Sequence, residues 1–247
     1  MSKSLPPYKD PAGASTLETI SKATAFNEWM YRNIAPYIQS PVLEIGSGLG
    51  NISSSLLQHH ANVMLSDIDP GYTHYLRKKF ADAPQVFGIQ NIDLADPAFQ
   101  QTNNSLRSHF RSVVYLNVLE HIEDDKTAVL NSASMLSPGG HLIILVPAFP
   151  FLYSRFDKEI GHCRRYTKHS LLHLISACGL ETVHWQYFNT TGIAGWLVFQ
   201  KWMGRPAISD NLMGLYNTLM PLNRIIDRTF RKIAGLSLII VARKTEE

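Results

Sequence analysis

The sequence predicts an α/β fold, with a mostly parallel sheet that carries helices on both faces. Short apolar runs alternate with helical stretches along most of the chain, which is the pattern of repeated strand–helix–strand units. The first apolar run ends in a glycine-rich turn, the place where doubly wound proteins bind nucleotide-like ligands. With 247 residues, the chain is long enough for one elaborated core and short for two.

The N-terminal half is expected to hold an arm, three helices and three strands. Residues 1–15 are rich in Pro, Gly, Ser and Lys and are expected to form a mobile arm. A helix follows, because Phe26, Met30 and Ile34 recur at helical spacing. Apolar runs that end at Gly, Asn or Asp predict the strands, and the stretches between them predict two more helices. The expected strands are residues 42–45, 62–65 and 86–89, and the later helices are residues 49–58 and 72–80.

The C-terminal half continues the alternation. After a strand at residues 112–116, Asp124 or Asp125 can cap a helix that stops at the Ser-Pro-Gly-Gly sequence 137–140. The segment between the last two strands, about 192–234, is far longer than a normal connection, and its apolar residues predict a helical insertion. The remaining strands are expected at residues 141–146, 181–188 and 236–242, with a helix at residues 171–177.

Composition excludes several classes of protein. The chain has 23 basic and 20 acidic residues, and this net charge of +3 is too small and too evenly spread to predict binding to nucleic acid. Two cysteines, Cys163 and Cys178, cannot build a disulfide framework, so a reducing, cytoplasmic location is expected. No apolar run approaches the ~20 residues that span a bilayer, and no secretory signal is visible, so no stable membrane insertion is expected.

The glycine-rich turn, residues 44–50, predicts a ligand site. Asp67 lies near the ~20-residue offset at which a carboxylate holds ribose hydroxyls. A dinucleotide is one interpretation, but its fingerprint requires a glycine where Asn51 stands. Glu44 is also awkward beside a pyrophosphate and suits a cationic ligand.

Five motifs in order resemble those of the class I S-adenosylmethionine-dependent methyltransferases. They are residues 42–50, Asp67, 91–94, 115–122 and 136–142, within a resemblance that covers about 41–180. The resemblance implies S-adenosylmethionine as cofactor and a Rossmann-like sheet of seven strands with the last antiparallel. It also implies that Asp67 holds the ribose, that Asp93 faces the adenine amino group and that Asn117 lies beside the methionine part. The full set of expected cofactor contacts is Glu44, Gly46, Ser47, Gly48, Asp67, Ile68, Asp93, Leu94 and Asn117.

The resemblance divides the chain into two parts. Residues 1–40 are expected to be an arm and a helix that cover the cofactor site, and residues 41–247 the methyltransferase domain. Residues 157–167 are similar to a Gly-His-x-Arg-Arg-Tyr loop of a bacterial subgroup that is often associated with glycosyl or natural-product pathways. That subgroup usually has an aromatic residue where Cys163 stands, so its substrates are not carried over.

The segment 148–166 leaves the fifth strand at its carboxyl end and is the expected substrate wall. Its predicted substrate contacts are Tyr153, Arg164, Arg165 and Tyr166. Aromatic side chains can pack an acceptor and an arginine can clamp an anionic group. In the alternative interpretation, the two arginines pair with Asp157 and Glu159 and only hold the loop together.

Two histidines are candidate catalytic bases. His162 follows a glycine in this loop, and His121 lies at the end of the fourth strand. Alternatively, His162 bonds a backbone carbonyl and His121 caps the next helix. Neither cysteine has metal-ligand spacing with a histidine pair, so no metal site is expected.

These features predict methyl transfer to an oxygen of a small molecule. A carboxylate acceptor, giving a methyl ester, is favoured because tandem arginines suit an acid and no base is then required. The alternative is a hydroxyl of a phenolic, sugar or lipid-linked acceptor, with His162 or His121 as base. From another class, the chain could be a non-catalytic cofactor-binding regulator. The 192–234 insertion is expected to be a lid or a homodimer contact, with a membrane-surface patch as the alternative.

Overall fold

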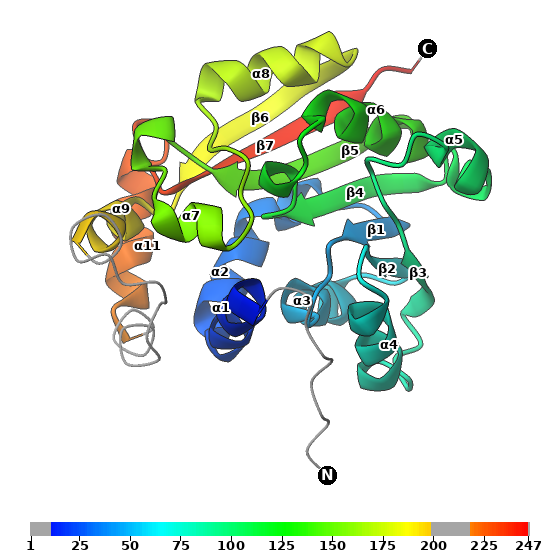
Figure 1. Ribbon diagram of the computed structural model, residues 1–247, viewed down its shortest axis with the longest axis horizontal. Helices are drawn as coiled ribbons and strands as arrows, with labels where there is room; N and C mark the ends of the chain where they lie inside the picture. The colour runs from blue at the N-terminus through cyan, green and yellow to red at the C-terminus, as the bar shows by residue number, and fades with distance from the viewer. Residues whose placement is uncertain (1–10, 199–217, 247) are drawn as a thin grey trace.

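The computed structural model describes residues 11–198 and 218–246, which form a seven-stranded sheet between two layers of helices (Figure 1). The strand order is β3-β2-β1-β4-β5-β7-β6, and β7 runs antiparallel to both of its neighbours. The predicted α/β fold, with seven strands and the last one antiparallel, is therefore confirmed. The strands are β1 Val42–Ile45, β2 Val63–Asp67, β3 Val86–Asn91, β4 Phe110–Leu116, β5 Leu136–Pro147, β6 Leu180–Phe188 and β7 Ser237–Lys244.

Helices follow the strands in the expected alternation. The α-helices are α1 Pro11–Lys22, α2 Thr24–Ile34, α3 Asn51–His59, α4 Pro70–Lys79, α5 Phe99–Thr102, α6 Asp125–Met135, α7 Arg155–Glu159, α8 Lys168–Ala177, α9 Thr190–Trp196 and α11 Met220–Phe230. The described residues also form short 3₁₀ helices, which are η1 Ala35–Tyr37, η2 Asn104–Leu106, η3 Leu119–His121 and η4 Pro150–Leu152. The cap of α6 is Asp124, whose Oδ1 accepts a hydrogen bond from the Thr127 N–H at 3.0 Å.

Two predicted boundaries were wrong. The arm expected over residues 1–15 already contains helix from Pro11, and residues 1–10 lie outside the described part of the chain. The fifth strand begins at Leu136 instead of His141. It starts early because Leu136 pairs with Phe110 at the start of β4, and this long-range pairing outweighs the local Pro-Gly-Gly turn signal.

Each face of the sheet has its own hydrophobic core. Side chains alternate along the central strands, so Leu43 packs with α6 and α8 on one side while Val42 packs with α2 and α3 on the other. Both core residues are fully buried. This two-sided burial explains why the central strands are nearly continuous apolar runs in the sequence.

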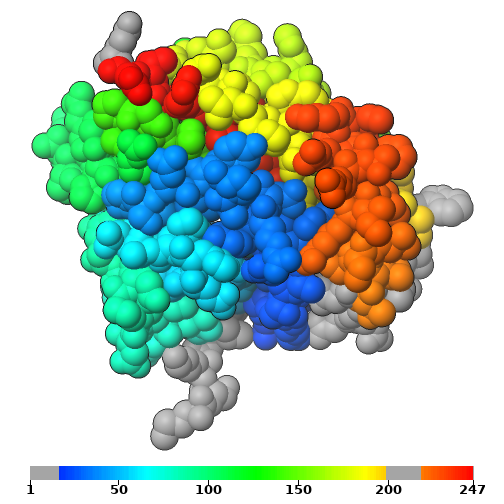
Figure 2. All heavy atoms as spheres, turned by 180° about the vertical axis from the view of Figure 1, so that it is seen from behind, coloured from blue at the N-terminus to red at the C-terminus, as the bar shows by residue number. Residues whose placement is uncertain are grey.

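The segment between β6 and β7 contains the predicted helical insertion. Its two ends form α9 and α11, and residues 199–217 lie outside the described part. On the back of the molecule α2 lies between α3 and α11 (Figure 2), where Arg224 Nη2 of α11 donates to the Ala25 carbonyl at 3.4 Å. Among the described residues, no helix has the length and apolar character needed to cross a membrane.

In doubly wound folds, ligands bind in a crevice outside the carboxyl ends of the strands, where the strand order reverses. β1 pairs with β2 on one side and with β4 on the other, both in parallel. The chain leaves β1 toward one side and returns in β4 on the other, so the connections diverge there, as at the ligand sites of doubly wound folds. The glycine turn after β1, Asp67 at the end of β2 and Asn117 after β4 all lie at this edge.

Candidate active site

The glycine turn needs its glycines for conformation and for space. Gly46, Gly48 and Gly50 all have positive φ angles, of 69°, 51° and 73°. A Cβ atom on Gly46 would overlap Cγ2 of Val118 in the segment after β4. The turn therefore packs directly against that segment, which joins two parts of the site that are far apart in sequence.

Asp67 ties the turn to the end of β2. Its Oδ2 accepts from the Gly48 N–H and its Oδ1 from the Asp69 N–H, each at 2.9 Å. Burial raises the pKa of this carboxyl group above its ordinary value. The next side chain, Ile68, is 64% exposed and presents an apolar surface beside the carboxylate. The contacts of Asp67 with a ribose and of Ile68 with the cofactor stay predictions.

The other expected cofactor contacts fall into two groups. Asp93 and Asn117 are exposed at the crevice, with Asn117 in the left-handed conformation at φ 57°. Leu94 instead has its side chain 2% exposed in the core, and its carbonyl accepts from Asn131 Nδ2 at 2.9 Å. The Leu94 side chain therefore cannot contact a ligand, because it faces the opposite way.

Glu44 lies beneath the glycine turn, not in the crevice. The residue is 6% exposed, and its Oε2 accepts from the hydroxyl groups of Ser53 and Ser47, the latter at 3.1 Å. Burial raises the pKa of Glu44 to about 7, despite these hydrogen bonds. The expected contact between Glu44 and a cationic ligand does not fit this position; Glu44 instead connects the turn to the start of α3.

Glu44 makes stability depend on pH. Since its pKa is about 7 when folded and 4.5 as its ordinary value, the folded state holds a proton that the unfolded state has lost between those values. Stability from this group is therefore lost as pH rises from 4.5 to 7. The free energy of unfolding of Glu44→Gln, taken relative to wild type, should be about 3 kcal/mol higher at pH 8 than at pH 5. Urea unfolding at the two pH values measures this change. Glu18→Gln, on the surface of α1, is the control, and an equal change in both variants would contradict this account.

Asp157 organises the loop that follows β5. With Ser154 it forms the capping box of α7, the Ser154 N–H donating to Asp157 Oδ2 at 2.8 Å. Asp157 Oδ1 accepts from His162 Nδ1 and from Arg165 Nε, each at 2.9 Å. Burial alone would raise the pKa of Asp157, but His162 and Arg165 together lower it below its usual range. Arg165 also lies over the ring of Trp196, 4.2 Å from its centroid.

The predicted substrate contacts in this loop are mostly occupied by the protein. The expectation that Arg165 binds substrate is not supported, because its side chain is 2% exposed and paired with Asp157. Arg164 pairs with Asp125 at 2.9 Å, and the Tyr166 hydroxyl donates to the same carboxylate at 2.9 Å. The loop-holding interpretation fits both arginines, although Asp125 replaces Glu159 as the partner of Arg164, and Glu159 pairs with Arg155.

Tyr153 remains at the surface of the loop. It is 38% exposed, and its hydroxyl donates to the His162 carbonyl at 2.7 Å. Its ring is therefore still available to pack against an acceptor, while its hydroxyl group fixes the backbone at His162. Its role in binding substrate stays a prediction.

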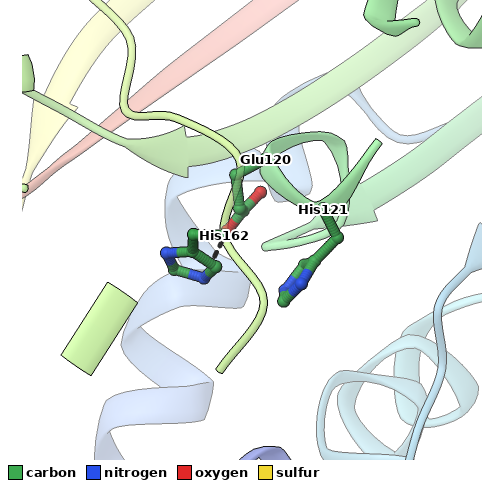
Figure 3. Close-up of side chains that lie close together, drawn as sticks. All are labelled: Glu120, His121 and His162. Carbon is green, nitrogen blue, oxygen red and sulfur yellow. Dashed lines mark ion pairs between the residues drawn. The ribbon is translucent and has the colours of Figure 1, made fainter. Parts of the chain in front are cut away.

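The two candidate bases meet in one cluster together with Glu120 (Figure 3). The loop is held on η3 by the Cys163 N–H, which donates to the Glu120 carbonyl at 2.7 Å. The rings of His121 and His162 are 4.7 Å apart, edge to face, and His162 Nε2 lies 3.7 Å from Glu120 Oε1. Glu120 is fully buried, and burial raises its pKa to about 8.

Sequence reasoning assigned Glu120 no role in this site. The residue is fully buried where the loop docks on η3. The one available signal was its position, directly after a buried strand and next to a histidine. The burial itself depends on a loop some forty residues later and cannot be read from local pattern.

Comparisons with known proteins agree with the geometry. Residues 43–142 match the family model described as a methyltransferase domain. Over 123 residues the chain is 28% identical to Probable polyketide synthase 41 of Dictyostelium discoideum, a match that covers 44% of this chain and 5% of that protein. The chain thus spans only a small fraction of the length of such curated relatives.

Solved structures share the fold at low sequence identity. A SAM-dependent methyltransferase from Archaeoglobus fulgidus superposes with a TM-score of 0.60 at 14% identity, covering 90% of this chain and 94% of that one. The CurJ carbon methyltransferase gives a TM-score of 0.55 at 16% identity, covering 90% of this chain and 54% of that one. The family match shows that residues 43–142 belong to a methyltransferase domain, and the solved neighbours show that the chain has the fold of S-adenosylmethionine-dependent methyltransferases.

Proposed function

We propose that this chain transfers the methyl group of S-adenosylmethionine to a hydroxyl oxygen of a small molecule. The observation that carries the proposal is the cluster of Glu120, His121 and His162 at the carboxyl end of β4. This cluster follows directly on Val118, which packs against the glycine turn. Groups able to ionise an acceptor thus lie next to the expected position of the cofactor.

The cofactor would lie across the carboxyl ends of β1, β2 and β4. Asp67 would accept hydrogen bonds from the ribose hydroxyls, and exposed Ile68 would cover one face of the adenine ring. Asp93 would face the adenine amino group, and Asn117 would lie beside the methionine part. Gly46 and Ser47 would let the cofactor approach the backbone of the turn closely.

A hydroxyl acceptor requires the loss of its proton. Methyl transfer is an in-line displacement in which a bond from oxygen to the methyl carbon forms while the carbon–sulfur bond breaks. Positioning of the two partners can supply about 7–11 kcal/mol of the barrier. His162 Nδ1 faces the carboxylate of Asp157, which leaves Nε2 unprotonated in the neutral ring. His121 is exposed and supplies a second nitrogen that can accept the proton.

A carboxylate acceptor, which the sequence favoured, has less support. That preference depended on two arginines free to clamp an acid. Arg165 is buried against Asp157, and Arg164 holds Asp125 and the Glu123 carbonyl. The proposal therefore moves to the hydroxyl acceptors, whose need for a base the histidine cluster meets.

Carbon is the second candidate acceptor atom. One structural neighbour is the CurJ carbon methyltransferase, and the sequence is similar to part of a polyketide synthase. A carbon next to a carbonyl group must also lose a proton before it attacks, so the same cluster would serve. Methylated products that resist both ether and ester cleavage would identify this outcome.

Replacing the histidines should remove methyl transfer without removing the cofactor. We expect His162→Ala and His121→Ala each to lower kcat by roughly 10²–10⁴ if the residue handles the acceptor's proton. His162→Asn keeps a donor toward Asp157 and separates the base from its structural role. The measurement is uptake of labelled methyl groups by a panel of phenols, sugars and carboxylic acids, with calorimetry of S-adenosylhomocysteine binding alongside.

The matched control is His173→Ala, on the exposed face of α8. It should leave both the turnover and cofactor binding unchanged. Full turnover in both His121→Ala and His162→Ala would contradict a proton-handling role for the cluster. Methyl esters as the only products would return the assignment to a carboxylate acceptor.

We also propose that residues 1–40 cover the cofactor site. Supporting this, Asn51 Nδ2 of α3 donates to the Leu17 carbonyl of α1 at 3.5 Å. A Cβ atom placed on Gly48 would lie 3.5 Å from Leu17 Cδ1. The 192–234 insertion would act as a lid or homodimer contact, and the free thiols of Cys163 and Cys178 suit a cytoplasmic setting.

A further inference from the structure

Glu120 carries a carboxyl group that is buried beneath the loop after β5. The residue is 0% exposed, and among the described residues neither oxygen has a donor within bonding range. The imidazole nitrogen His162 Nε2 is 3.7 Å from Oε1, which is too long for a hydrogen bond. Leaving such a group unsatisfied destabilises the folded protein, and more so if the group is ionised. A partner that lies between Glu120 and the imidazoles would remove this destabilisation.

The three side chains point ligand atoms at one another. One oxygen of Glu120 and one nitrogen each of His121 and His162 all lie within 4.8 Å of one another, and Figure 3 shows the three side chains close together. Metal–ligand bonds of about 2.0–2.2 Å would hold such atoms about 3.0–3.5 Å apart. Closing the widest separation in the set thus needs a shift of at most about 1.3–1.8 Å, which the exposed His121 side chain can supply.

The surroundings orient the cluster as a second shell orients metal ligands. Asp157 lies 2.9 Å from His162 Nδ1 and is itself fixed by Arg165, so Nε2 is directed toward Glu120. This carboxylate–histidine arrangement is typical of bound metals. The hydrogen bond from the Cys163 N–H to the Glu120 carbonyl holds the two ligand-bearing segments together.

We propose that Glu120, His121 and His162 bind a divalent first-row transition metal ion, such as Zn²⁺ or Mn²⁺. Two imidazoles with one carboxylate favour these ions over Mg²⁺ or Ca²⁺, which prefer all-oxygen ligands. Three protein ligands leave at least one coordination position open, as in catalytic sites. The sequence predicted no metal site because its ligands come from two distant segments and include a carboxylate rather than a cysteine.

The metal site deepens the proposed function, and its role in deprotonating the acceptor rests on that function. An acceptor hydroxyl bound at the open position loses its proton to solvent more easily, because the metal stabilises the oxyanion. The oxygen then forms a bond to the methyl carbon as the carbon–sulfur bond breaks, giving a methyl ether and S-adenosylhomocysteine. No oxidation or reduction takes place, and with metal bound both imidazoles serve as ligands.

The test is calorimetric titration of Zn²⁺ and of Mn²⁺ into the full chain, purified without a polyhistidine tag and stripped with a chelator. We expect one equivalent to bind, with a Kd in the micromolar range or below. His121→Ala and Glu120→Gln should each weaken binding at least tenfold, and His173→Ala should bind as wild type does. His121→Ala is expected to fold because the side chain is exposed, which circular dichroism checks.

Absence of stoichiometric binding, or equal binding by wild type and both ligand variants, would overturn the metal site. A parallel titration with S-adenosylhomocysteine separates this result from the proposed function. Cofactor binding without metal binding removes only the metal site. Metal binding lost in the two variants, in a protein that binds no cofactor, supports the site and removes the methyltransferase role assigned to it.

Discussion

Replacing Arg165 by alanine is expected to lower the free energy of unfolding by about 3–5 kcal/mol, because it leaves a buried carboxylate without its cation. The Asp157 side chain is 0% exposed and the Arg165 side chain 2% exposed, and their closest atoms are 2.9 Å apart. The variant also loses the contact of the guanidinium with the Trp196 ring. Urea unfolding followed by circular dichroism measures the change.

An exposed ion pair in the same segment gives the matched control. Arg155 pairs with Glu159 at 2.6 Å, but the Arg155 side chain is 85% exposed. Surface pairs of this kind contribute about 0–1 kcal/mol, so Arg155→Ala should unfold almost as wild type does. A loss below 1 kcal/mol in Arg165→Ala, or equal losses in the two variants, would show that Arg165 does not stabilise the loop and would reopen its role toward an anionic substrate.

Replacing Asp67 by alanine is expected to weaken binding of S-adenosylhomocysteine at least about 100-fold. A hydrogen bond to a charged group contributes about 1.5–3 kcal/mol, and in the proposed complex the carboxylate would accept from two ribose hydroxyls. The change also removes the acceptor for the Gly48 N–H, which holds the glycine turn in position. Calorimetric titration of wild type and variant measures the loss.

Asp96→Ala is the control for a lost turn-forming carboxylate. Asp96 Oδ1 accepts from the Ala98 N–H at 2.8 Å, much as Asp67 Oδ1 accepts from the Asp69 N–H, but Asp96 is not one of the expected cofactor contacts. It should bind cofactor as wild type does. Asp67→Asn, with its smaller change in shape, covers the case in which the alanine variant does not fold. Unchanged affinity in both Asp67 variants would place the ribose elsewhere.

Most of the fold could be predicted from the sequence because its signals are local. The central strands are buried on both faces, so they are apolar runs that stop at Gly or Asp, as at Gly46 and Asp67. The limits of β5 could not be predicted in this way. Its first residue, Leu136, belongs to the strand because Phe110 pairs with it, and such pairing is invisible to local pattern.

The same difference between local signals and long-range contacts decides which residues of the candidate site could be predicted. The glycine turn and Asp67 are close in sequence and follow strand ends, so their roles could be assigned from motif and spacing. Arg165 and Glu120 could not be assigned, because what each does depends on burial by distant segments. An arginine in an aromatic loop predicts anion binding until the structure places a carboxylate 2.9 Å away.

The central claim is that the carboxyl ends of β1, β2 and β4 bind S-adenosylmethionine and hold it beside the Glu120, His121 and His162 cluster. Calorimetric titration of S-adenosylhomocysteine into the wild-type chain tests the first half of this claim directly. The account predicts one site per chain with a Kd in the micromolar range, roughly –8 kcal/mol. No heat of binding with S-adenosylhomocysteine, together with saturable binding of a nicotinamide dinucleotide, would contradict it.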